Sequence, residues 1–192
     1  MIRSICVFSS SSNSVQKGYF QFADDLGKQI ATRDIKLVYG GASVGLMGQI
    51  ANAASKDGGE VIGVVPKRID DLGVTNNDVE IILTTTMHDR KAKMHELSDG
   101  FIILPGGFGT LEETFEIITM KQLGYHQKPI IIVNITGFFD TLMDFLDELY
   151  ESRFIKAGFR EMYHVVDNID AIFEYLENYQ PPRLPLKVGR VI

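Results

Sequence analysis

The chain has 192 residues, of which 45% are hydrophobic and 23% are charged, a composition ordinary for a soluble globular protein. This length supports one domain with a substantial core and is too short for two. The net charge of −6 and the pI near 5.2 argue against nucleic-acid binding over a basic face. They leave room for a small anionic ligand, which needs only one local arginine or helix terminus.

Cys6 is the only cysteine, so an internal disulfide is impossible and a reducing, cytoplasmic location is expected. Because Cys6 lies within an apolar run, we expect a buried strand residue rather than a nucleophile. The first apolar run is too short for a signal peptide, and no run approaches the ~18 apolar residues of a membrane span. We therefore expect no membrane partner. The four histidines lack metal-ligand spacing and there is no second cysteine, so we expect no metal site.

Seven apolar runs of strand length alternate with helical patterns along the chain. Strands that are apolar throughout are typical of a parallel sheet covered on both faces, so this order predicts a doubly wound α/β fold. The expected strands are Ile5–Phe8, Lys36–Tyr39, Val61–Val65, Glu80–Leu83, Phe101–Leu104, Ile130–Asn134 and Tyr163–Val166. The expected helices cover about 14–32, 44–56, 87–98, 110–124, 138–151 and 169–179.

The domain is expected to cover residues 1–180 as a single unit. The polar segment 66–79 is expected to form a loop, because it has a glycine and an Asn-Asn pair and lacks apolar periodicity. Residues 181–192 contain three prolines and little periodicity, so we expect an extended carboxyl-terminal tail.

Three loops rich in glycine or serine follow predicted strands, at Ser9–Ser14, Gly40–Gly48 and Pro105–Thr110. Ligands of doubly wound folds bind at the carboxyl ends of the strands, so we expect these loops to build one composite site. In the first loop Ser10 is a candidate substrate-binding residue, although serines there can equally form turns and cap the next helix.

The second loop supplies Gly40 and Gly41 as further candidates for substrate binding. Their lack of a side chain can bring the backbone close to a ligand. It can also serve close packing of the following helix, in which Gly45, Gly48 and Ala51 form a stripe of small residues. Both explanations remain open from the sequence.

The predicted helix over 87–98 places a charge on its apolar side. Arg90 falls between Met87, Met94 and Leu97, while Lys91 lies at the edge of this stripe. A guanidinium that faces a core needs an anionic partner, which can be a structural carboxylate or a ligand in an active site.

The third loop carries the strongest signal in the chain. An apolar strand runs into Gly106, Gly107 and Gly109 and then into a helix, an arrangement that presents free N–H groups and the positive end of the helix dipole. We therefore expect this loop to bind a phosphate. Thr110 and Glu113 can belong to the same site, or they can form a T-x-x-E capping box.

Common nucleotide-binding and hydrolase fingerprints are missing from the chain. It contains no GxxxxGK[ST] motif and no GxSxG elbow. The run that starts at Gly107 resembles GxGxxG but has Glu112 in place of the third glycine, which disfavours an ordinary dinucleotide fold.

Two carboxylates share one side of the helix that follows the third loop. Glu113 and Glu116 lie three residues apart and continue into Ile117 and Met120. Apolar residues also lie on the opposite side, so we expect this helix to be covered on both sides and to be a candidate for subunit contact. The dipole at its start can hold the carboxylates in the ionised form.

The chain resembles the LOG ("Lonely Guy") family of cytokinin riboside 5′-monophosphate phosphoribohydrolases. The resemblance is carried by two motifs, Met87-His88-x-Arg90-Lys91-x-x-Met94 and Pro105-Gly106-Gly107-x-Gly109-Thr110-x-x-Glu113, and it runs through most of the chain. Membership implies a Rossmann-like fold, usually as a homodimer, and hydrolysis of the N-glycosidic bond of a nucleoside 5′-monophosphate. The products would be the free base and ribose 5-phosphate, and no cofactor is implied.

The resemblance also implies roles for single residues. Arg90 and Glu113 match the catalytic pair, and Gly107, Gly109 and Thr110 match the phosphate cradle. Glu116 lies where a further site carboxylate is expected, and Lys91 and Gly106 of the same motifs are further candidate substrate-binding residues. Apolar residues would line a pocket for an N6 substituent, and the candidates are Met87, Met94 and Met120. Glu113 can stabilise an oxocarbenium-like state, orient water or hold ribose hydroxyls, and Arg90 can fix the phosphate or the departing purine.

Two points in the sequence qualify the resemblance. Family members commonly have glycine in the loop after the first strand, where this chain has four serines, Ser9–Ser12, so the contacts of that loop are open. Glycine loops also bind phosphates without cleaving them, so a non-catalytic nucleotide or cofactor carrier of similar fold is the alternative. The label lysine decarboxylase, often attached to such proteins, finds no support because no Schiff-base lysine can be singled out.

Overall fold

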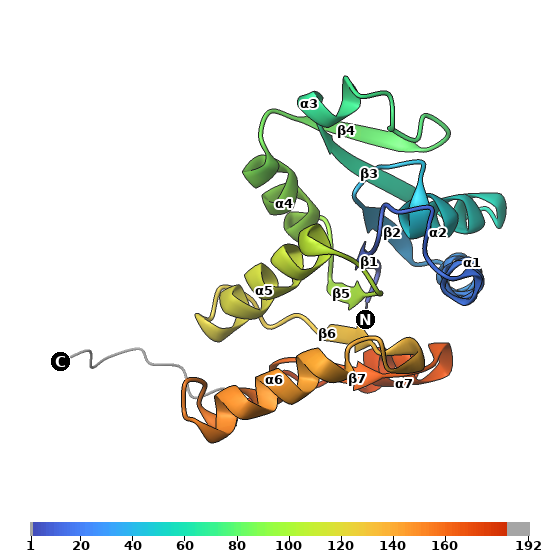
Figure 1. Ribbon diagram of the computed structural model, residues 1–192. Coiled ribbons are helices and arrows are strands. Elements are labelled where there is room, and N and C mark those ends of the chain that lie inside the picture. The colour runs from blue at the N-terminus through green and yellow to red at the C-terminus, as the bar shows by residue number, and fades with distance from the viewer. Residues whose placement is uncertain (1, 184–192) are drawn as a thin grey trace.

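The computed structural model describes residues 2–183, which form one seven-stranded, fully parallel sheet with helices on both faces (Figure 1). The strand order is β4-β3-β2-β1-β5-β6-β7, so the chain winds outward in both directions from β1. The predicted doubly wound α/β fold is therefore confirmed. Its switch point lies between β1 (Ser4–Phe8) and β5 (Gly100–Ile103), whose first registered pair is Ile5 with Gly100.

The other elements follow the predicted order with small differences at their ends. The remaining strands are β2 (Lys36–Tyr39), β3 (Val61–Pro66), β4 (Glu80–Thr84), β6 (Ile130–Val133) and β7 (His164–Val166). The helices are α1 (Lys17–Thr32), α2 (Gly45–Lys56), α3 (Lys67–Asp70), α4 (Met87–Glu96), α5 (Phe108–Gln122), α6 (Asp140–Glu151) and α7 (Ile169–Asn178), with 3₁₀ turns η1 (Ile135–Gly137) and η2 (Ala157–Met162).

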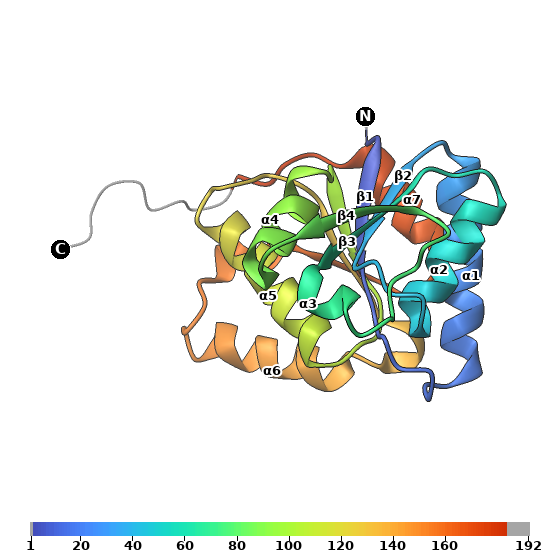
Figure 2. The same cartoon turned by 90° about the horizontal axis from the view of Figure 1, so that it is seen from above.

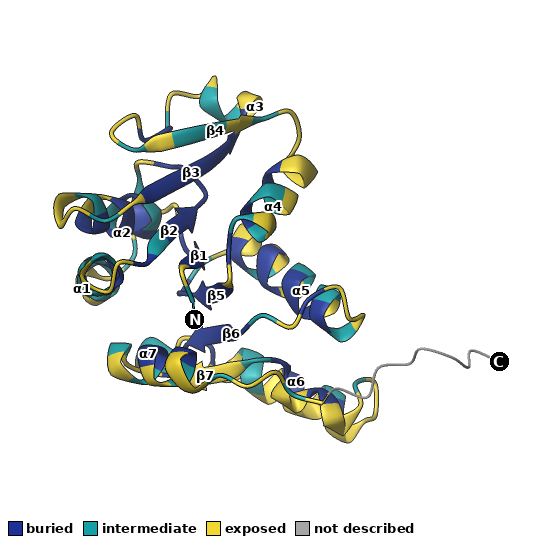
Figure 3. Cartoon of the chain, turned by 180° about the vertical axis from the view of Figure 1, so that it is seen from behind, coloured by how far each residue is buried: buried dark blue, intermediate teal, exposed yellow. Residues whose placement is uncertain are grey.

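The sheet separates two hydrophobic cores, and alternate residues of each strand contribute to one or the other. In β1, Ile5 and Val7 face α1, α2 and α7, whereas Cys6 and Phe8 face α4, α5 and α6. Figure 2, seen from above, shows these helices on either side of the strands. Figure 3 shows that the central strands are buried while the edge strand β4 is partly exposed, as expected where nothing covers a sheet edge.

Two predictions about loops and caps are wrong. The segment 66–79 contains one helical turn, α3, and Thr75 forms an isolated bridge with Ala42, so it is not entirely loop. The serine loop does not cap α1, which begins at Lys17 after Gln16 without a side-chain cap. Instead, Ser12 N–H donates to Ser10 Oγ and Ser14 N–H to Ser12 Oγ, so these serines stabilise turns.

The carboxyl-terminal segment is only partly described. Residues Pro181–Arg183 lie outside helices and strands, and residues 184–192 of the expected tail lie outside the described residues. Within residues 2–183, no helix is long and apolar enough to cross a membrane.

Candidate active site

Helix α4 delivers Arg90 to the carboxyl ends of β2 and β3. A capping box fixes the start of this helix: Asp89 N–H donates to Thr86 Oγ1, and Thr86 N–H donates to the Asp89 carboxylate. Arg90 follows directly and is only 8% exposed, so the guanidinium is held inside the protein. The anionic partner that the sequence required is Glu113 of α5.

Arg90 is bound on three sides. Its Nη1 donates to Glu113 Oε1 at 2.7 Å, its Nε donates to the Val64 carbonyl at 3.0 Å, and its Nη2 lies 3.5 Å from the Gly40 carbonyl. Because a guanidinium has five N–H groups, two stay available for a ligand. Arg90 thus joins the ends of two strands to the helix that carries Glu113, and fixes the orientation of that carboxylate.

Glu113 is buried at the same place, with 8% of its surface exposed. Burial raises the pKa of the Glu113 carboxyl above its ordinary value, and the adjacent Arg90 charge opposes this rise. Arg90 donates to Oε1 of this carboxylate, and among the described residues no hydrogen bond to Oε2 is found, which leaves Oε2 open to a ligand. A fixed, water-shielded carboxylate of this kind suits the stabilisation of a developing positive charge.

The glycines at Gly40 and Gly41 are required by protein contacts. A Cβ at Gly40 would lie 2.2 Å from Nη2 of Arg90, and a Cβ at Gly41 would lie 2.1 Å from a methyl group of Val65. Gly41 also has a φ of +77°, which other residues rarely adopt. The missing side chains therefore make room for Arg90 and for the turn after β2.

The start of α5 is open to a ligand. Its N-cap is Gly107, which provides no side-chain cap, and in the described part of the chain nothing accepts the N–H groups of Gly106, Gly107, Phe108, Gly109 and Thr110. Of the two alternatives for Thr110 and Glu113, the capping box is not formed: α5 begins before Thr110, and Glu113 accepts from Arg90. Free N–H groups at the start of a 15-residue helix form a suitable cradle for a phosphate.

The glycines of this third loop divide into two kinds. A Cβ at Gly106 would lie 2.1 Å from Oγ1 of Thr110, so Gly106 is needed for packing. At Gly107 and Gly109 a Cβ would meet nothing within 4 Å, and neither has a positive φ. No contact within the described chain requires glycine at these two positions, and the space beside them is open.

Helix α2 offers a contrast, because its N-terminus is closed. Gly45 N–H donates to Asn13 Oδ1, and the N–H groups of Leu46 and Met47 both point to the Ser10 carbonyl. The second loop therefore cannot cradle a phosphate through these N–H groups. It supports the first loop, which in turn reaches the third, since Ser10 N–H donates to the Pro105 carbonyl at 3.2 Å.

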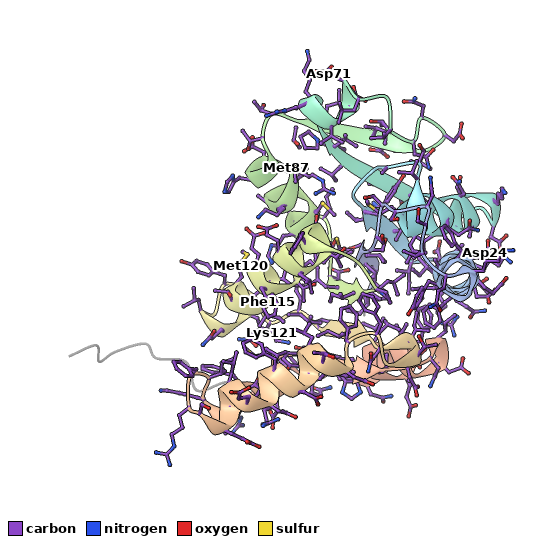
Figure 4. All side chains as sticks on the ribbon, viewed as in Figure 1. Asp24, Asp71, Met87, Phe115, Met120 and Lys121 are labelled. Carbon is purple, nitrogen blue, oxygen red and sulfur yellow. The ribbon has the colours of Figure 1, made fainter. Side chains whose placement is uncertain are left out.

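The structure thus gathers most predicted site residues at one end of the sheet, and it places three of them differently. Lys91 extends to α5, where its Nζ contacts the carboxylates of Glu112 and Glu116. Met87 lies at the exposed start of α4 (Figure 4). Met94, another candidate for the base pocket, is 1% exposed and belongs to the core.

Two contributors to the site escaped the sequence analysis. Asn13 closes the start of α2 through its side chain, and the Val64 carbonyl binds Arg90 from the end of β3. A backbone carbonyl carries no sequence signal. Asn13 precedes α1 in the sequence, and no local pattern links its side chain to the start of α2, 32 residues further along the chain.

The solved structures with this fold include two proteins that handle molybdenum cofactor. The molybdenum cofactor carrier protein of Chlamydomonas reinhardtii superposes with a TM-score of 0.68 at 22% identity, over 92% of this chain and 97% of that one. The molybdenum cofactor binding protein of Rippkaea orientalis gives a TM-score of 0.70 at 21% identity, over 92% and 96%. At these identities the likeness shows a shared fold.

Sequence relatives are closer. A family profile described as "possible lysine decarboxylase" matches residues 47–176. A probable cytokinin riboside 5′-monophosphate phosphoribohydrolase of Oryza sativa subsp. japonica is 43% identical over 93% of this chain and 72% of its own length. A second protein with this activity in its name, from Arabidopsis thaliana, is 42% identical over 93% of this chain and 84% of its own length. The chain therefore belongs to the LOG family of phosphoribohydrolases.

Proposed function

We propose that this protein hydrolyses the N-glycosidic bond of adenosine 5′-monophosphate and its N6-modified forms, and releases the free base and ribose 5-phosphate. The observation that carries the proposal is a buried Arg90–Glu113 pair beside an uncapped helix start at Gly107. We expect the helix start to bind a phosphate and the ion pair to supply a fixed carboxylate. The names of the relatives, at about 40% identity, support the same reaction.

The phosphate would lie on the N–H groups of Gly107, Gly109 and Thr110, where the helix dipole favours a dianion. Ser10 N–H donates to the Pro105 carbonyl, and this link to the third loop supports a contact of Ser10 with the phosphate or the ribose. The turn at Gly40 and Gly41 would border the substrate on the side of Arg90.

Glu113 would act on the ribose. Breaking the bond between C1′ and the base nitrogen leaves an oxocarbenium-like sugar, and the Glu113 carboxylate would stabilise this positive charge. A water molecule then adds its hydroxyl to C1′, and its proton goes to the departing base. Arg90 would orient the carboxylate and favour its ionised form, because its positive charge opposes the rise in the Glu113 pKa that burial causes. The guanidinium itself cannot act as a proton donor near neutral pH.

The remaining predicted residues lie around this centre. Met87 would contribute to the side on which the base or its N6 substituent lies, since its side chain is 46% exposed at the start of α4. Lys91 and Glu116 form an ion pair between α4 and α5, and their charges would act on the bound substrate from there.

We further propose a cytoplasmic homodimer. Several large apolar side chains of α5, α6 and the turn before α6 are exposed, among them Phe108 at 94% and Phe145 at 53%. They adjoin an apolar hollow of about 400 Å³ lined by Gly106, Leu111, Phe138, Phe139, Thr141, Leu142 and Phe145. A second copy of this chain would cover such a surface. The lone buried Cys6 agrees with a reducing compartment.

The test compares base release by the wild type and by Glu113→Gln. Chromatography after incubation with AMP or with N6-isopentenyladenosine 5′-monophosphate should show free base from the wild type. The variant keeps its size and loses only the charge, so its kcat should fall by about 10²–10³. Glu96→Gln, at the exposed end of α4, is the matched control and should retain wild-type activity. Tight binding by the wild type without base release would instead support the carrier.

A further inference from the structure

Lys91 stands beside Arg90 on α4 and makes a second link to α5. Its side chain is only 11% exposed, and its Nζ contacts Glu112 Oε1 and lies 3.1 Å from Glu116 Oε2. Neighbouring cations of α4 thus contact three carboxylates of α5: Arg90 contacts one and Lys91 contacts two.

These three carboxylates present an electrostatic difficulty for a phosphate site. Glu112, Glu113 and Glu116 lie within about two turns of the open helix start, and helical side chains lean toward that end. A phosphate dianion bound there would be repelled by every uncompensated carboxylate within about 10 Å. Arg90 compensates Glu113, which leaves Glu112 and Glu116.

We propose that Lys91 is a positioning residue that lets the phosphate bind by neutralising Glu112 and Glu116, rather than by touching the substrate. This inference rests on the proposed function of the same site. The contacts support it, because the Lys91 ammonium group is already engaged by the Glu112 and Glu116 carboxylates.

The charge on Lys91 is well maintained. Burial lowers the pKa of its ammonium group, but the contacts with Glu112 and Glu116 outweigh burial and raise the pKa above its ordinary value. Lys91 therefore remains a cation throughout the neutral pH range, and its positive charge continues to offset the negative charges of Glu112 and Glu116.

The test removes the cation first and then its partners. Lys91→Met should raise the KM for AMP about tenfold and change kcat little, because the repulsion acts on the bound phosphate. The triple variant Lys91→Met, Glu112→Gln, Glu116→Gln should return KM to near the wild-type value. Lys93→Met is the matched control, since Lys93 lies on the same helix but pairs only with Glu96, and its KM should not change.

Salt distinguishes repulsion from a loss of packing. Raising the ionic strength should lower the KM of Lys91→Met toward that of the wild type, because salt screens the exposed Glu112 carboxylate and the half-buried Glu116 carboxylate. A triple variant that stays as impaired in KM as Lys91→Met would overturn the proposal and indicate direct contact with the phosphate. The proposal would also be overturned if Lys91→Met and the triple variant lost the same amount of kcat and showed the same drop in melting temperature. That result would indicate that Lys91 only stabilises the contact between α4 and α5.

The dissociation constant of AMP, measured by calorimetry on the same proteins, separates this inference from the proposed function. If the wild type binds AMP without releasing base, the proposed function fails. The role of Lys91 still stands if Lys91→Met binds AMP more weakly than the wild type and the triple variant binds it about as tightly as the wild type. If the wild type releases base and the affinities do not follow that order, only the role of Lys91 fails.

Discussion

At the scale of single residues, the absence of a side chain decides where the substrate can lie. Thr110 occupies the position that a Cβ of Gly106 would take. At Gly107 and Gly109, no described atom lies within 4 Å of the corresponding position. Gly40 belongs to the first kind, because the Arg90 guanidinium occupies the place of its Cβ. Neighbouring glycines of one motif therefore differ: Gly106 serves packing, whereas Gly107 and Gly109 leave space for the proposed substrate.

This distinction predicts opposite results for two alanine substitutions. Gly109→Ala should leave stability unchanged or raise it by up to about 1 kcal/mol, because alanine favours the helix, while the KM for AMP should rise about tenfold. Gly106→Ala should destabilise the fold by about 1–3 kcal/mol, because its Cβ would overlap Thr110. Urea unfolding and steady-state kinetics measure both. A stable Gly106→Ala, or an unaffected KM in Gly109→Ala, would contradict the assignment.

At the scale of elements, two helix starts of similar sequence have different roles. Asn13 and the Ser10 carbonyl occupy the N–H groups of α2, and the start of α5 is open. Helix α5 must be held in place if its open end is to bind a ligand. His126, in the segment after α5, provides one such contact: its Nε2 donates to the Ile117 carbonyl at 2.8 Å, and its Nδ1 accepts from Lys128 N–H.

These two hydrogen bonds require neutral His126 and predict a dependence of stability on pH. Burial lowers the pKa of His126 from 6.5 to about 4 in the folded protein. The unfolded chain therefore binds the proton first, and the stabilisation is complete above pH 6.5 and is lost as the pH falls toward 4. The free energy of unfolding should decrease by about 3 kcal/mol over this range.

Urea unfolding between pH 7 and pH 4 measures this change. His126→Gln keeps a donor for the Ile117 carbonyl but does not titrate. Most of the change in the free energy of unfolding between pH 7 and pH 4 should therefore disappear in this variant. A variant with the same slope as the wild type would assign the effect to other groups, such as the neighbouring His95, whose pKa burial also lowers.

At the scale of the whole molecule, strand periodicity was enough to predict the fold. Seven apolar runs predicted seven parallel strands, because a strand buried on both faces needs apolar residues throughout. The ends of α5 were not predictable from local rules. The T-x-x-E pattern at Thr110 and Glu113 satisfies the requirements of a capping box, but the ion pair with Arg90 determines where Glu113 points.

The gathering of the site was also predictable only in part. Arg90 on an apolar stripe indicated a buried anionic partner, and the strand order brings that partner to it. The pairing of Lys91 with Glu112 and Glu116 depends on the angle between α4 and α5, for which the sequence has no local signal. The sequence also has no local signal for the burial of Lys121. This residue is fully buried and donates to the Met162 carbonyl and the Tyr179 hydroxyl.

Hydrolysis of the glycosidic bond is tested most directly by the origin of the sugar oxygen. The wild type is incubated with AMP or N6-isopentenyladenosine 5′-monophosphate in water enriched in oxygen-18, and the ribose 5-phosphate is analysed by mass spectrometry. Free base should appear together with ribose 5-phosphate that carries one oxygen-18 atom at C1. Absence of free base, or ribose 5-phosphate without the label at the earliest times, would contradict the account.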